Sequence, residues 1–375
     1  MTELLKHYFD IASATPVDPS VIEAMLPYFH THFANPNAQH QCGQEAAKAI
    51  KQSTKTIADI LNIDPKGIIW TSGATESIAT SVISATKYYK SDNKNKILTT
   101  SIEHSALTEA INQVSSDITY LSNLKKNGLI DANEIKTYKH VYMLGTHHVN
   151  NEIGVIQPLN EVIDVCRTKG IITCIDATQS LGKVSFDKIP TDADYLTLSC
   201  HKAFGPRGIG ILYANQKPKR HIESIVYGKS RWHERPGTPN TALIVGFAKA
   251  LELFENRSLD KVSRLKACFL KHIHPDIKPN LSHDAMVPHI QNIHLQGVLA
   301  PTLIHYLKDF CVATGSACHS ENYSASHVLA AIELDESAPR ESIRVSFCHK
   351  HTEEDIKYFC QCLNETYQKL RAMNP

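Results

Sequence analysis

The sequence has no long apolar segment and almost no net charge, and both absences narrow its possible functions. No run among the 375 residues approaches the roughly 18 apolar residues that a membrane-spanning helix needs. Residues 1–10 include acidic side chains and no apolar core, so we expect no signal peptide and no membrane partner. The net charge of +1, without blocks of one sign, gives no support for direct binding of nucleic acid.

Paired cysteine motifs are also missing. The ten cysteines are irregularly spaced and form no C-x-x-C pair, so we predict no metal site. Several lie in apolar runs, where a thiol acts as a small hydrophobic group. With no export signal, the sequence predicts reduced thiols and a cytoplasmic location. Cys318 is the exception because it lies in a small, polar, glycine-containing segment beside His319, where a thiol is accessible and more easily ionised.

The central part of the chain alternates short β-rich runs with helical stretches. The runs are 67–70, 96–100, 117–121, 141–145, 170–175, 195–198 and 208–213. This pattern predicts an α/β fold of pyridoxal-enzyme type, with a seven-stranded, mostly parallel sheet covered on both faces. The last two runs are joined by too few residues for a crossover helix, so we expect that pair to be antiparallel.

The remainder of the chain has an α+β pattern. A long apolar helix is predicted over 241–256, followed by a polar stretch over 256–261 near which we place a domain boundary, and then by strands at 290–295 and 342–347. Further helices are expected around 301–309, 324–333 and 353–371. We therefore predict a large domain of residues 15–255, and a small domain of residues 1–14 and 256–375 that carries the Cys318 loop.

Polar residues follow the predicted strands, where ligands of α/β sheets gather. Lys202 ends the run at 195–198 beside a glycine-rich turn, a suitable place for a Schiff base with an aldehyde cofactor. Gly73, Ala74 and Thr75 begin a helix after the first run, and free backbone N–H groups there suit a phosphate.

Other strand ends supply the remaining groups that such a cofactor needs. Asp176 can hold a pyridine nitrogen protonated, and Gln179 can reach a ring substituent. An asparagine after 141–145 can donate to a phenolic oxygen, and His104 can stack on a ring and move protons. Each residue alone has an ordinary alternative as a surface lysine, helix cap, turn residue or buried histidine. Together the five strand ends predict pyridoxal phosphate.

Two further residues have both a functional and a structural interpretation. Arg344 lies inside a predicted strand, where its guanidinium can bind a substrate carboxylate or form a structural ion pair. Cys318 is either a nucleophile on an accessible loop or an incidental loop cysteine.

These motifs resemble those of the pyridoxal phosphate-dependent cysteine desulfurases, a class V branch of the fold-type I aminotransferase-like enzymes. The similar segments are 10–19, 35–40, 71–77, 103–104, 148–154, 176–180, 201–210, 236–238, 314–320 and 342–346. The Gly-Ser-Ala-Cys loop at 315–318 resembles that of the group with a long cysteine loop, which supplies iron–sulfur cluster assembly and tRNA thiolation.

The resemblance implies a role for each residue in a homodimer that acts on L-cysteine. Lys202 would bind the aldehyde, His104 would stack on the ring, and Asp176 would contact the pyridine nitrogen. The phosphate would contact Ala74, Thr75, Ser199 and His201, with Thr238 from the other subunit. Asn151 and Gln179 would bind the phenolic oxygen, and Asn151 and Arg344 the substrate. Cys318 would hold the persulfide for a sulfur-acceptor protein, with transient contact to an iron–sulfur cluster.

The sequence departs from the family pattern at three places. Cys200 replaces the usual glycine between Ser199 and His201, which we expect to put a side chain near the phosphate. The usual Ala-Ala-Thr-Thr reads Ala-Ser-Ala-Thr over 12–15, and the usual Arg-Ser-Gly-Thr has proline at position 236. One alternative is a selenocysteine lyase or another class V enzyme. Cys200 and the altered loop over 228–238 leave a non-catalytic homologue as a second alternative.

Overall fold

The computed structural model describes residues 3–124, 126–229, 234–254, 257–314 and 325–373. Its first sheet contains β1 (Ile68–Thr71), β2 (Lys96–Thr99), β3 (Ile118–Tyr120), β4 (Val141–His147), β5 (Ile172–Asp176), β6 (Tyr195–Ser199) and β7 (Gly210–Ala214). The strand order is β1-β7-β6-β5-β4-β2-β3. Strands β3, β2, β4, β5 and β6 run parallel, and β7 is antiparallel to both β6 and β1. The predicted seven-stranded, mostly parallel sheet and its antiparallel last pair are confirmed.

Helices cover both faces of this sheet, because alternate strand residues point to opposite sides and both sides are apolar. Ile69, Ile97 and Met143 pack with α5 (Ala74–Tyr89) and α6 (Ser105–Val114). Trp70 and Leu144 pack on the other face with α4 (Gln41–Leu61), α8 (Leu159–Lys169) and α9 (Thr241–Glu252). The remaining helices of this part are α2 (Pro19–Met25), α3 (Pro27–His30) and α7 (Ala132–Thr137).

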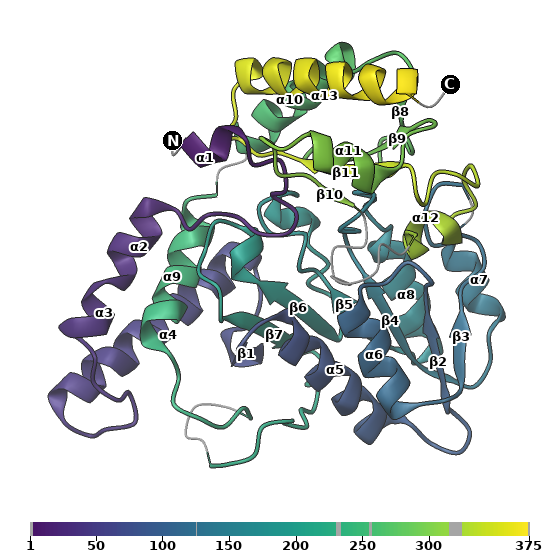
Figure 1. The fold of residues 1–375 in the computed structure, drawn as a ribbon. Helices are drawn as coiled ribbons and strands as arrows, with labels where there is room; N and C mark the ends of the chain where they lie inside the picture. The colour runs from purple at the N-terminus through teal and green to yellow at the C-terminus, as the bar shows by residue number, and fades with distance from the viewer. Residues whose placement is uncertain (1–2, 125, 230–233, 255–256, 315–324, 374–375) are drawn as a thin grey trace.

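A second, antiparallel sheet lies above the first in Figure 1, in the order β10-β11-β9-β8. Its strands are β8 (Ile277–Pro279), β9 (Ile290–Leu295), β10 (Ala313–Thr314) and β11 (Ser342–Ser346). It packs against α10 (Arg257–His272) and α13 (Glu353–Met373), and the chain adds α1 (Glu3–Lys6), α11 (Ala300–Tyr306) and α12 (His327–Ala331). The N-terminal segment joins this sheet, since Asp10 forms an isolated bridge with Ser346.

One helix boundary was predicted wrongly. The helix predicted over 241–256 ends at Glu252, and the polar stretch over 256–261 contains the start of α10 at Arg257. That stretch is helical because the buried residues Val262, Leu265 and Phe269 recur at helical spacing on one face. The boundaries proposed for the two domains stay predictions.

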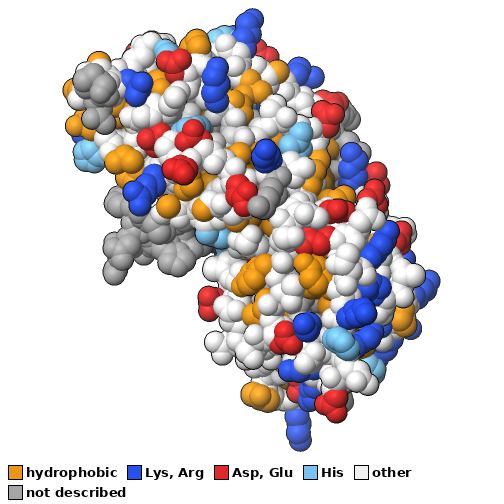
Figure 2. All heavy atoms as spheres, turned by 90° about the vertical axis from the view of Figure 1, so that its right-hand side faces the viewer, with side chains coloured by type: hydrophobic (Ala, Val, Ile, Leu, Met, Phe, Trp, Pro, Cys, Tyr) orange, Lys and Arg blue, Asp and Glu red, His pale blue; other side chains and the backbone are white. Residues whose placement is uncertain are grey.

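The surface carries charges of both signs. Figure 2 shows acidic and basic side chains interspersed over one face, in agreement with the net charge of +1. Within the described part of the chain, no helix combines the length and apolar character needed to cross a membrane.

Candidate active site

A cavity of about 550 Å³ lies at the carboxyl ends of β1, β4, β5 and β6. It is lined by nine residues predicted from the sequence, which are Ala74, Thr75, His104, Asn151, Asp176, Gln179, His201, Lys202 and Arg344. Of the other predicted residues, Ser199 is buried beside His201, Thr238 lines a different pocket, and Cys318 lies outside the described residues. Side chains from distant parts of the sequence thus converge on one cavity.

Lys202 ends a short 3₁₀ turn (Cys200–Lys202) that follows β6. Its Nζ donates hydrogen bonds to the carbonyl oxygens of Ala12 and Ser13, at 2.9 and 2.7 Å. A second lysine, Lys183, is buried behind it and donates to the Lys202 carbonyl oxygen at 3.1 Å. Burial, together with the charge of Lys202, lowers the pKa of Lys183 to about 7.

One end of the cavity is suited to a phosphate. Helix α5 begins after Gly73 without a side-chain cap, which leaves its first N–H groups available to an anion. A Cβ at Gly73 would meet nothing within 4 Å, so the space in front of this turn is open. On the cavity wall, the Nδ1 of His201 lies 2.9 Å from the Ser199 hydroxyl, and burial lowers the pKa of His201 to about 4.

The Asp176 carboxylate ends β5 and accepts a hydrogen bond from the Thr178 N–H at 2.9 Å. Among the described residues, Thr178 Oγ1 and Gln179 Oε1 are buried without a hydrogen-bond partner, although both residues line the cavity. Buried polar atoms are normally paired, so these two indicate a polar ligand. Together with the anion site of α5 and the lysine at the cavity wall, they fit pyridoxal phosphate.

His104 caps α6, and its orientation is fixed by that cap. Its Nδ1 accepts the backbone N–H of Ala106 at 3.1 Å, so in the neutral ring the proton lies on Nε2. Burial lowers the pKa of His104, and the nearby Asp176 partly opposes that change.

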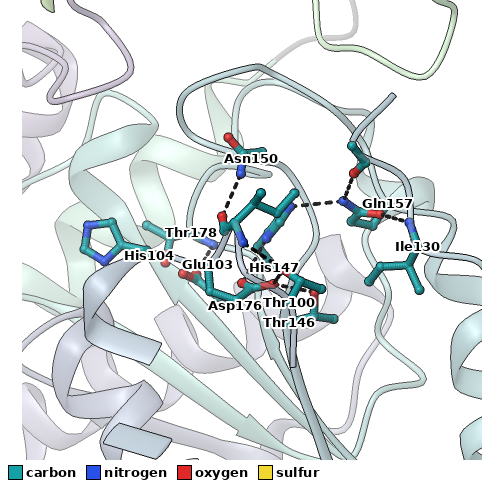
Figure 3. Close-up of polar contacts among 12 residues, drawn as sticks. Thr100, Glu103, His104, Ile130, Thr146, His147, Asn150, Gln157, Asp176 and Thr178 are labelled. Atoms are coloured by element: carbon teal, nitrogen blue, oxygen red, sulfur yellow. Dashed lines mark hydrogen bonds and ion pairs between the residues drawn. The ribbon is translucent and has the colours of Figure 1, made fainter. Parts of the chain in front are cut away.

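A buried network holds the residue before His104 in place (Figure 3). The Glu103 carboxylate accepts hydrogen bonds from the Thr100 and Thr146 hydroxyls at 2.5 and 2.8 Å, and lies 2.9 Å from the Nδ1 of His147. The Nε2 of Gln157 lies 3.2 Å from the Nε2 of His147, and its Oε1 accepts a backbone N–H. Because Oε1 is the acceptor, the Gln157 Nε2 must be the donor toward His147. His147 therefore accepts at Nε2 and donates from Nδ1 to Glu103.

Arg344 has the features of both interpretations given above. Its Nη2 donates to the Asp10 carboxylate and to the Ser13 hydroxyl, each at 2.7 Å, and its Nη1 donates to the Asn151 carbonyl oxygen at 2.8 Å. Its Nε is buried and has no partner within the described ranges. The arginine is therefore an ion-pair partner of Asp10 and also a cation on the cavity wall.

Comparisons with known proteins decide the family. The aminotransferase class-V family matches residues 7–359. The cysteine desulfurase IscS of Dechloromonas aromatica (strain RCB) is 36% identical over 390 aligned positions, which cover 100% of this chain and 95% of that protein. This chain belongs to the class-V family, in its cysteine desulfurase branch. Enzymes of this branch depend on pyridoxal phosphate.

Solved structures of similar proteins agree with this family. A structure described as a NifS-like protein has a TM-score of 0.88 and 27% identity, covering 97% of this chain and 99% of that one. A structure of SspA in complex with cysteine has a TM-score of 0.80 and 31% identity, covering 92% and 100%.

In this desulfurase-family chain, the expectation that Cys200 puts a side chain near the phosphate was wrong. Cys200 is fully buried in the large core and is absent from the described lining of the cavity. Its Sγ lies 1.9 Å from where a Cβ of residue 205 would stand, so it fills the space that Gly205 leaves empty. Burial raises the pKa of the Cys200 thiol, which makes it unreactive.

Sequence reasoning missed several residues of the site. Asp10, Ser13, Thr178, Lys183 and the partners of Glu103 lie at or behind the cavity wall. Thr178 had a local signal, since it lies between Asp176 and Gln179 at the end of a strand. Asp10 and Ser13 lie in the similar segment 10–19, but their contacts with Arg344 join parts of the chain that are far apart in the sequence.

The buried His148 predicts acid sensitivity. Its Nδ1 lies 2.8 Å from the Ser180 hydroxyl, and burial lowers its pKa from 6.5 to about 4. Between these values the unfolded chain binds more protons, so stability falls as the pH falls. We expect this histidine alone to reduce the free energy of unfolding by on the order of 2 kcal/mol between pH 7 and 5. Urea unfolding at both pH values should show a smaller difference for His148→Asn, and an unchanged difference would contradict this.

Proposed function

We propose that this chain converts L-cysteine to L-alanine and retains the sulfur as a persulfide on Cys318. The observation that carries the proposal is that Lys202 and Arg344, the groups for a substrate amine and a substrate carboxylate, line one cavity and both contact Ser13. Asp176 and the open start of α5 supply the matching contacts for the cofactor ring and phosphate.

The described residues on either side of the Cys318 segment contact Arg344, which lines the cavity, and two buried glutamates next to lining residues. Before it, Ala313 of β10 pairs with Arg344. Cys318 follows Thr314 by four residues, and a chain of four residues reaches at most about 14 Å. After it, Ser326 donates to the buried Glu152, and the Nε2 of His327 lies 3.2 Å from the carbonyl oxygen of Glu103. These attachments support Cys318 as the nucleophile.

Each residue of the site has a separate proposed role toward the cofactor or the substrate. Bound pyridoxal phosphate supplies an aldehyde for the substrate amine and a ring that withdraws electrons from Cα. Asp176 would hold the ring nitrogen protonated, Asn151 and Gln179 would contact the phenolic oxygen, and Arg344 would hold the substrate carboxylate. The Nζ of Lys202 would remove the Cα proton, and His104 would stack on the ring and exchange protons from Nε2.

Sulfur transfer then conserves atoms and electrons. The Cys318 thiolate attacks the substrate sulfur, so an S–S bond forms while the Cβ–S bond breaks. The electron pair of the broken bond stays with the carbon fragment, which takes up protons to become alanine. L-Cysteine and the enzyme thiol thus give L-alanine and an enzyme persulfide, without an external oxidant.

The test is to measure alanine from L-cysteine with purified, cofactor-loaded protein. Without an acceptor or reductant we expect one alanine per active site, and with dithiothreitol we expect continued turnover with one sulfide per alanine. Release of pyruvate, or transfer of the amino group to a keto acid, would instead support another class V activity. Bound cofactor without any product would support a non-catalytic homologue.

We also propose a homodimer in which Thr238 serves the partner's site. Thr238 lines a pocket with Phe29 and Phe33, apart from the Lys202 cavity, and these phenylalanines are 58% and 74% exposed. Apolar side chains so exposed at one site are typical of an interface. Sedimentation should give a dimer, and Phe29→Asp with Phe33→Asp should give monomers that bind the cofactor at least tenfold more weakly. A wild-type monomer with full activity would contradict this.

The persulfide sulfur would pass to an acceptor protein in the cytoplasm, either an iron–sulfur cluster scaffold, with transient cluster contact at Cys318, or a protein of tRNA thiolation. Pull-down with the persulfidated protein, compared with the reduced protein, would identify the acceptor. Enrichment of neither class would contradict this assignment.

A further inference from the structure

Ser13 contacts both cations of the cavity. Its carbonyl oxygen accepts a hydrogen bond from the Nζ of Lys202, and its hydroxyl accepts one from the Nη2 of Arg344, each at 2.7 Å. The residue is partly exposed and lines the cavity.

The hydrogen-bond donors of Arg344 indicate how the Ser13 hydroxyl can take part in binding a carboxylate. Both hydrogens of Nη2 are engaged, one by the Asp10 carboxylate and one by Ser13. A carboxylate that binds a guanidinium through two parallel hydrogen bonds uses Nη2 together with either Nε or Nη1. Nε has no partner among the described residues. A bound carboxylate must therefore replace Asp10 or Ser13 as an acceptor, and the neutral hydroxyl is the weaker of the two.

We propose that Ser13 is a specificity-determining residue that binds the α-carboxylate of the substrate together with Arg344. Once the carboxylate takes over the Arg344 hydrogen bond, the Ser13 hydroxyl donates its own proton to a carboxylate oxygen. The amino and carboxylate groups of an α-amino acid are separated by one carbon, and Ser13 contacts both the lysine and the arginine that face these groups. This inference rests on the proposed desulfurase function and names a further substrate contact in the same site.

The test compares three holoenzymes, the wild type, Ser13→Ala and Ser13→Thr, in alanine formation from L-cysteine. We expect Ser13→Ala to raise KM about tenfold, which is the effect of losing one hydrogen bond to a charged group. We expect kcat to change less than about twofold. The inhibition constant of L-alanine, which carries the same carboxylate, should rise by the same factor. Ser13→Thr keeps the hydroxyl and should stay within about twofold of the wild type. The cofactor absorbance should not change, because the hydrogen bond from Lys202 to Ser13 goes to the Ser13 carbonyl oxygen, which the substitution keeps.

Three results would overturn the assignment of Ser13. These are an unchanged KM in Ser13→Ala, a raised KM with an unchanged inhibition constant for L-alanine, and a Ser13→Thr variant as weak as Ser13→Ala. A wild-type enzyme that forms no alanine would instead overturn the proposed function, so the two failures are distinguishable.

Discussion

Replacement of Cys318 by serine is expected to abolish alanine formation from L-cysteine while pyridoxal phosphate remains bound. A serine hydroxyl cannot accept sulfur as a persulfide, so the Cβ–S bond of the substrate has no nucleophile to break it. We expect the rate to fall at least a hundredfold, since the residue supplies the attacking atom rather than a supporting contact. The measurement is alanine release at saturating L-cysteine, with the visible spectrum recorded to confirm the bound cofactor.

A matched control comes from the same part of the chain. Cys311 is an exposed thiol seven residues earlier, and its isolated bridge to Tyr8 involves only backbone. Cys311→Ser should retain alanine formation close to that of the wild type. Full turnover by Cys318→Ser, or an equal loss in both variants, would show that Cys318 is not the sulfur acceptor.

Much of the fold could be predicted because its signals are local. Strands buried on both faces are mostly apolar, as in β4 and β6, and each is followed by a helix or a turn. Strands β8 and β10 were missed because they have only three and two residues, too few for a period to appear. The end of α9 was missed because apolar residues continue through Phe254 after the helix has ended.

The site was predictable to the extent that it lies at strand ends. Asp176, His104 and Lys202 each follow a strand, and strand ends of a parallel sheet meet at one edge. Asp10 and Ser13 reach Arg344 across more than 330 residues, and no local pattern indicates such a contact. The orientation of Cys200 was also unpredictable, because the short turn after β6 directs it into the core while Lys202 faces the cavity.

Replacement of Lys202 by alanine should remove the visible absorbance of the lysine-bound cofactor and reduce alanine formation at least a thousandfold. The variant loses the amine that binds the aldehyde, and also the base proposed to remove the Cα proton. It further loses two hydrogen bonds to the carbonyl oxygens of residues 12 and 13. Absorbance spectra of protein reconstituted with pyridoxal phosphate, recorded beside the alanine assay, measure both effects.

A variant of the neighbouring Lys183 tests whether Lys202→Ala loses the visible absorbance through the missing amine or through the missing positive charge. Lys183 is buried next to Lys202 and interacts with it, yet it is absent from the described lining of the cavity. At pH 6, below the pKa of about 7 of Lys183, Lys183→Met removes a positive charge behind Lys202 and leaves the amine of Lys202 intact. If covalent binding causes the absorbance, Lys183→Met keeps it and Lys202→Ala loses it. If the local positive charge merely retains the phosphate, both variants lose cofactor alike, and equilibrium dialysis with pyridoxal phosphate would show equal weakening. Retained absorbance in Lys202→Ala would rule out Lys202 as the anchor, whatever Lys183→Met does.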